Sequence, residues 1–242
     1  MDTLALARMM QFGDSMLPTG AFAFSNGLEA AVQTKVVHDA ETLRQFTETA
    51  LEQAASGDAV GVAWAVRAAR HARDGENDEA MGLLRLTDNA LFVRKLPEES
   101  RSMFTRTGKK LAEMGAAVTA SPLASRWLEL IRAGGTPGTY PVTLAVLFAA
   151  LHRDRAPADP LLQEALTVHL YGVVMGILNA ALRLMRLTHI EAQALLYGLT
   201  ARFDELAGRA AATPLEHMSN YAPMTDILGA AHARAHVRLF MS

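Results

Sequence analysis

The chain contains no cysteine among its 242 residues. This excludes disulfides, zinc sites built on thiolates and cysteine nucleophiles, and it fits a cytoplasmic protein. The N-terminus also lacks the long apolar run of a signal peptide. Aromatic residues make up only 6% of the sequence although 50% of it is hydrophobic. Alanine and leucine dominate that half, which favours helices, and no alternating run bounded by hairpin signals predicts a strand.

The sequence also lacks a large excess of positive or negative charge, with 23 Lys and Arg residues against 25 Asp and Glu residues. The formal net charge is −2, so nothing draws the chain to nucleic acid or to an anionic membrane. Residues 166–182 are uncharged and approach the length that crosses a bilayer. His169 and Asn179 interrupt this run, and Arg183 and Arg186 follow it. We therefore predict a helix buried in the centre of a bundle, and no membrane partner.

The usual catalytic motifs are missing from the sequence. It has no glycine-rich phosphate loop followed by Lys and Ser or Thr, and no HExxH pair. No Glu is followed three residues later by His, which removes the signature of di-iron helical bundles. We predict no catalytic residue and no cofactor.

Helical periodicity is present along nearly the whole chain. After Asp39, the apolar residues Leu43, Phe46, Ala50 and Ala54 fall on one helical face. We expect further helices at about 60–73, 77–93, 98–118, 122–133, 142–151, 161–187 and 189–208. The fold class is therefore all-α: a single-domain bundle of about ten helices, with the 161–187 helix central. The stretch 207–214 is the only plausible linker, so we assign the helical domain to residues 1–213 and a partner-binding tail to residues 214–242.

Three histidines toward the C-terminus are candidate metal ligands. His232 and His236 are spaced i, i+4 on an expected helix, a geometry that chelates nickel or zinc when a third ligand joins. His217 is the nearest third candidate. The alternative is that His232 lies in a partner contact and that none of the three binds metal, and we predict no metal site.

A basic segment lies in the middle of the chain, in the sequence RKLPEESRSMFTRTGKKL at residues 94–111. Its cations are offset only by Glu98 and Glu99. Two interpretations remain open: a solvated helix face, or a surface that docks an acidic partner. The residues concerned are Arg94, Lys95, Arg101, Arg106, Lys109 and Lys110.

The segment QFGDSMLPTGAFAFSNGLEAA at residues 11–31 suits neither a helix interior nor a solvated loop. Pro18 and Gly20 break regular structure, while Leu17, Phe22 and Phe24 are apolar side chains of a size that is usually buried. An apolar loop that enters a helix near Ser25 is therefore expected to pack on a surface, its own or a partner's.

Five blocks in the right order resemble the UreF family of urease accessory proteins. Residues 11–31 are similar to the family's opening LADSxLPxGGFxxSxGLE, with Ala21 at its second Gly, and residues 94–111 to its basic RxxSxxMGRRL helix, with Thr107 where Met is usual. Tyr140-Pro141 matches a YP pair before an apolar helix. Residues 176–196 resemble SNLVxAAVRLxPLGQxxGQ but depart from it at 186, 188 and 189, and the end HVRLFMS resembles RHETQYSRLFRS. In that last block His232, Arg238, Leu239, Phe240 and Ser242 match by position.

The resemblance implies a non-enzymatic factor for urease maturation, with departures that indicate a divergent member. Such a factor binds a UreD/UreH-type scaffold, recruits a UreG-type GTPase, engages apo-urease so that nickel is inserted, and forms a homodimer. The alternative is a helical ligand-binding or enzymatic domain with a pocket in the bundle. We expect the tail to be mobile until the scaffold binds it. The partner-binding residues expected from the resemblance and from the basic segment are Ser15, Leu17, Pro18, Phe22, Arg101, Arg106, Lys109, Lys110, His232, Arg238, Leu239 and Phe240.

Overall fold

Eleven α-helices and the short 3-10 helix η2 make up the regular structure of a computed structural model that describes residues 3–21, 24–72, 77–152, 160–223, 227 and 240. These residues contain no β-strand, which confirms the all-α bundle expected from the sequence. The helices are α1 (Thr3–Gly13), α2 (Leu28–Gln33), α3 (Ala40–Ser56), α4 (Asp58–His71), α5 (Asp78–Arg94), α6 (Glu98–Thr119), α7 (Pro122–Arg132), α8 (Tyr140–Leu151), α9 (Pro160–Leu184), α10 (His189–Thr200), α11 (Phe203–Ala212) and η2 (Leu215–His217).

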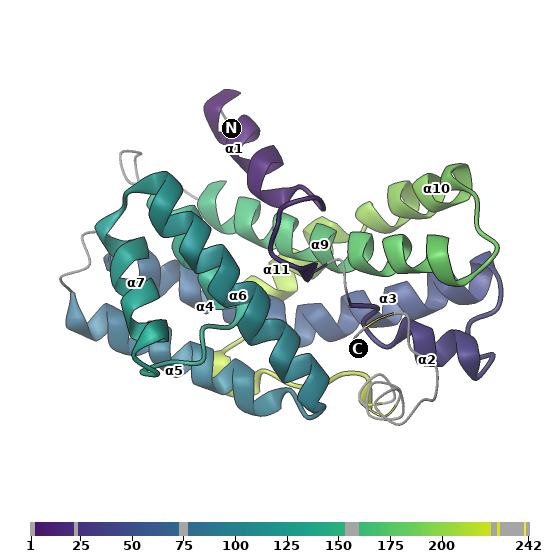
Figure 1. Ribbon diagram of the computed structural model, residues 1–242, viewed down its shortest axis with the longest axis horizontal. Coiled ribbons are helices and arrows are strands. Elements are labelled where there is room, and N and C mark those ends of the chain that lie inside the picture. The colour runs from purple at the N-terminus through teal and green to yellow at the C-terminus, as the bar shows by residue number, and fades with distance from the viewer. Residues whose placement is uncertain are drawn as a thin grey trace.

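Helix α9 lies in the middle of the bundle, as expected from its apolar composition (Figure 1). It packs against α1, α2, α3, α4, α8, α10 and α11. Leu166, Leu170 and Val174 are completely buried. It is the one described helix long and apolar enough to cross a membrane, and 56% of its apolar window is buried inside the fold. That burial is typical of a core helix.

The helix expected at 189–208 is divided in two, so this prediction is wrong in its bounds. α10 ends at Thr200 and α11 begins at Phe203. Neither Gly nor Pro marks the break, which depends on packing instead. Arg202 reaches back to Glu52 of α3 (2.5 Å), and Phe203 and Leu206 turn into the core.

A buried carboxylate holds the loop that precedes α8. Asp88 of α5 accepts hydrogen bonds from the Thr136 hydroxyl (2.6 Å) and from the backbone N–H groups of Gly138 (2.6 Å) and Thr139 (2.8 Å). Burial raises the pKa of Asp88 despite these bonds. The same loop approaches α6 so closely that a Cβ on Gly108 would lie 2.1 Å from the Gly138 carbonyl oxygen. Together these contacts fix α6 against the start of α8.

Residues 213–222 lie along α3, α4 and α5. The indole of Trp64 donates to the Thr213 carbonyl (3.0 Å), and the Ser219 N–H donates to the Ser56 carbonyl (3.0 Å). Met218 is buried. The first part of the expected tail therefore packs on the helical domain, and the boundary at 213/214 stays a prediction.

Candidate functional site

The loop after α1 is ordered by hydrogen bonds between its own residues. The Asp14 side chain accepts from the Met16 N–H (2.8 Å), and the Leu17 N–H donates to the Asp14 carbonyl (3.0 Å). Leu17 packs against the core, while Ser15, Met16 and Pro18 are exposed. The loop is therefore packed down at Leu17 and presents its other side to solvent. Phe22 lies outside the described residues.

This loop and α6 form a groove of about 390 Å³. It brings together two sequence blocks that were singled out separately, because the loop supplies one wall and three cations of α6 supply the other. Lys110 pairs with Glu113 at 2.8 Å, and Lys109 is exposed. We call this the basic groove; its main lining residues are Pro18, Gly20, Arg106, Lys109, Lys110 and Glu113.

Arg101 does not belong to the basic groove. Its guanidinium donates to the carbonyls of Lys95 (2.9 Å) and Leu96 (3.1 Å), just past the end of α5. Arg94 likewise donates to the Ala90 and Met218 carbonyls. The basic segment therefore divides, since Arg94 and Arg101 bind backbone carbonyls and only the later cations line the groove.

The one described residue near the C-terminus, Phe240, packs on its own domain. It is 5% exposed, and its N–H donates to the buried Glu29 carboxylate (3.0 Å). The Arg183 guanidinium lies over the Phe240 ring, 3.9 Å from its centre. The expectation of a free tail before partner binding is therefore wrong at this residue. His232, His236, Arg238 and Leu239 lie outside the described residues.

A metal centre is not assembled by the part of the chain that the structure describes. No three His, Asp or Glu side chains come together there as ligands. His217, the candidate third ligand, is exposed on η2.

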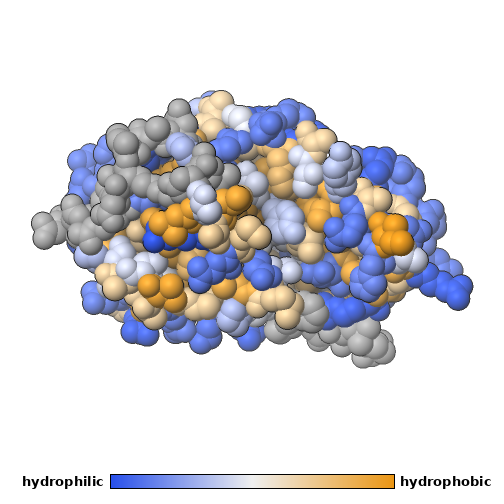
Figure 2. Space-filling model, turned by 90° about the horizontal axis from the view of Figure 1, so that it is seen from above, coloured by the Kyte–Doolittle hydropathy of each residue, from blue (hydrophilic) through white to orange (hydrophobic). Residues whose placement is uncertain are grey.

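The exposed side of α10 was not identified from the sequence. Only Ala192 and Leu199 of this apolar helix are buried. Ile190 is 83% exposed and Tyr197 84% exposed, and Ala194 lies between them on the same helical face. Figure 2 shows apolar residues reaching the surface at several places on the side seen from above, where α10 forms one end of the molecule. We call Ile190, Ala194 and Tyr197 the α10 face.

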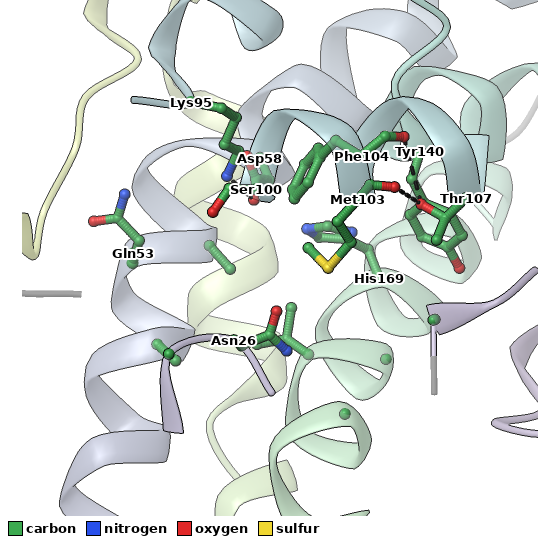
Figure 3. A pocket seen from close by; sticks show the side chains of 17 residues that line it. Asn26, Gln53, Asp58, Lys95, Ser100, Met103, Phe104, Thr107, Tyr140 and His169 are labelled. Atoms are coloured by element: carbon green, nitrogen blue, oxygen red, sulfur yellow. Dashed lines mark hydrogen bonds and ion pairs between the residues drawn. The ribbon is translucent and has the colours of Figure 1, made fainter. Parts of the chain in front are cut away.

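The structure also contains a pocket of about 220 Å³ that was not identified from the sequence. It lies beside His169 of α9, which the sequence presented only as a polar interruption in an apolar run. Neither ring nitrogen of His169 has a hydrogen-bond partner, so His169 forms no catalytic relay with Asp58 or Ser100, which also line the pocket. Figure 3 shows the imidazole below Phe104 and beside the Met103 side chain.

These features define a class of protein. The described residues form an all-helical bundle that offers a basic groove and an apolar helix face, both suited to contact with other proteins.

Similarity to known proteins identifies the family within that class. The UreF family model matches residues 37–200. The chain is 48% identical over 240 residues to the urease accessory protein UreF of Photorhabdus laumondii, covering 99% of both chains. It is 49% identical over 240 residues, again 99% of both, to the proteins of the same name from Yersinia pestis (strain Pestoides F) and Yersinia pseudotuberculosis serotype I. The chain therefore belongs to the UreF family of urease accessory proteins.

Proposed function

We propose that this chain is a non-enzymatic factor of urease maturation that works in the cytoplasm. In this proposal it bridges a UreD/UreH-type scaffold and a UreG-type GTPase, so that nickel enters apo-urease. The nickel is cargo of the assembly, and hydrolysis of GTP belongs to the partner. Family membership across 99% of the chain supports a role in urease maturation.

The observation that carries the bridging role is the basic groove. Two blocks separated by some eighty residues in sequence meet there, and the groove presents Arg106, Lys109 and Lys110 around an opening at the surface. Clustered cations speed the encounter with an acidic partner and set its orientation more than they add to affinity. An acidic surface on the scaffold or on the GTPase is the complementary partner.

The α10 face supports the proposed homodimer. Ile190 and Tyr197 are large side chains left in water, and aromatic residues are frequent at the centre of protein interfaces. A two-fold axis beside α10 would pair this face with its own copy, as closed dimers require.

Charge reversal tests the groove. Lys109→Glu with Lys110→Glu should slow association with the scaffold or the GTPase about tenfold at low salt, and the difference should shrink as salt rises. Thermal stability should change little, because these exposed charges contribute little to folding. Association rates from surface plasmon resonance at two salt concentrations measure this.

A matched control reverses two exposed cations away from the groove, Lys35→Glu with Arg186→Glu. It carries the same change in net charge and should bind nearly as the unaltered protein does. If both double variants bind each partner as fast as the unaltered protein does at every salt concentration, the groove is a solvated face and the docking role is wrong.

A further inference from the structure

The pocket beside His169 is built from segments that are distant in sequence. We call it the His169 pocket. One end carries the polar side chains of Asp58, Lys95 and Ser100, and α6 covers it with Met103 and Phe104 (Figure 3). At about 220 Å³ it is smaller than the roughly 300–1,000 Å³ of sites for drug-sized molecules. It suits a ligand of one ring.

His169 is the unusual member of the pocket. Its side chain is 4% exposed, and neither Nδ1 nor Nε2 has a hydrogen-bond partner. Buried polar atoms in native proteins are nearly always paired, so an unpaired imidazole that lines a cavity indicates a missing partner. Burial lowers the pKa of His169 to about 4, so at neutral pH the ring has one donor and one acceptor nitrogen.

The charges around the pocket cancel. The Lys95 Nζ atom lies 2.8 Å from an Asp58 carboxylate oxygen, and both side chains are less than one fifth exposed. Lys95 also lies over the Phe104 ring, 4.1 Å from its centre. An anionic ligand would face Asp58 and a cationic one Lys95, so the pocket favours an uncharged ligand.

Small residues make the space for a flat group. Gly172 and Gly176 lie one turn apart on α9, and a Cβ on Gly172 would meet nothing within 4 Å. Met103, Phe104 and Val173 offer apolar contact, and thioether sulfur packs well against aromatic rings. The pocket thus joins apolar contacts to the unpaired imidazole of His169, and Asn26, Gln53 and Ser100 are further polar side chains in its lining.

We infer that the His169 pocket binds an uncharged aromatic alcohol, with its hydroxyl hydrogen-bonded to His169 and its ring against Met103 and Phe104. The site needs neither the scaffold nor the GTPase, so it stands independently of the proposed function. The ligand class follows from the neutral imidazole, the cancelled charges and the size of the cavity.

Titration of the full-length protein with phenol tests this site. The imidazole signals of ¹⁵N-histidine-labelled protein are followed, with the His169 signal assigned from a His169→Gln variant. Phenol should shift that signal saturably. Toluene, which replaces the hydroxyl by a methyl group, should bind about tenfold more weakly because it cannot pair with the imidazole. Benzoate and benzylammonium, which carry charge, should bind more weakly than phenol.

Gly172→Leu provides the matched variant, since it fills the cavity from α9 and replaces a poor helix former. It should abolish the response to phenol. Gly208→Leu on α11, another glycine whose Cβ would meet nothing within 4 Å, should leave the response intact. If Gly172→Leu loses helical circular dichroism, Gly172→Ala adds a single methyl group and should still weaken phenol measurably.

Three results would overturn the inference. The first is a His169 signal that phenol does not move up to its solubility limit, which would mean that the pocket holds water only. The second is equal binding of toluene and phenol. The third is an unchanged phenol response in a folded Gly172 variant.

Discussion

Helices α9 and α10 follow each other along the chain, and both are rich in apolar residues, yet their surroundings are opposite. In α9, Leu166, Leu170 and Val174 are completely buried. In α10, Ile190 and Tyr197 each leave more than four fifths of their surface exposed. Apolar composition therefore accounts for the formation of both helices but not for their burial.

Position in the bundle explains the difference. α9 is surrounded by seven other helices, whereas α10 packs mainly on α9 and α3 at one end of the molecule (Figure 1). A single helix at the end of a bundle has no further layer to cover its outer face. This contrast supports the proposal that a second copy of the chain covers α10.

The largest effect on folding is expected from α9. Leu166→Ala removes a fully buried side chain and leaves a cavity, so it should lower the free energy of unfolding by about 2–5 kcal/mol. Ile190→Ala on α10 should change it by less than about 0.5 kcal/mol. Urea denaturation followed by circular dichroism compares the two, and similar losses would refute the contrast.

Acid should destabilise the protein through His169 of α9. Its pKa is near 6.5 when unfolded and about 4 when folded, so between these values the unfolded chain takes up a proton that the folded chain excludes. Stability from this group is complete above pH 6.5 and falls as the pH drops toward 4, by about 3 kcal/mol in total. His169→Leu should flatten the stability curve of the unaltered protein in that window. Denaturation at a series of pH values measures both slopes.

A smaller effect is expected at the start of α10. Thr188 accepts from the Glu191 N–H, and Glu191 accepts from the Thr188 N–H (2.8 Å), which is a capping box. Thr188→Ala should cost about 1 kcal/mol of unfolding free energy. Thr188→Ser, which keeps the hydroxyl, should cost much less. Equal losses for the two variants in urea denaturation would show that the cap contributes nothing.

The smallest effect on the fold is expected from Tyr197→Asp, which places a charge on the α10 face. Helical circular dichroism should stay unchanged while the mass in solution falls from dimer to monomer. Tyr221→Asp alters another exposed tyrosine and should leave the dimer intact. Sedimentation equilibrium at micromolar concentration measures this mass. If the Tyr197→Asp variant is still a dimer, α10 does not form the interface.

Local sequence patterns predicted the helices well because periodicity and caps act over a few residues. The central place of α9 also followed from its uncharged run. The position of Phe240 could not be predicted, because it depends on Glu29 and Arg183, which come from distant parts of the chain. Arg101 was grouped with Arg106, Lys109 and Lys110 because charge is visible in a sequence. Its bonds to the Lys95 and Leu96 carbonyls are not. The His169 pocket was not predicted either, because its lining residues come from distant parts of the chain.

The bridging role is tested most directly by the native mass of a reconstituted assembly. The chain is mixed with a UreD/UreH-type scaffold and a UreG-type GTPase, and the product is measured by light scattering after size exclusion. We expect one species that contains all three proteins, and no association of scaffold and GTPase when the chain is omitted. A scaffold and GTPase that associate equally well without it would contradict the proposed function.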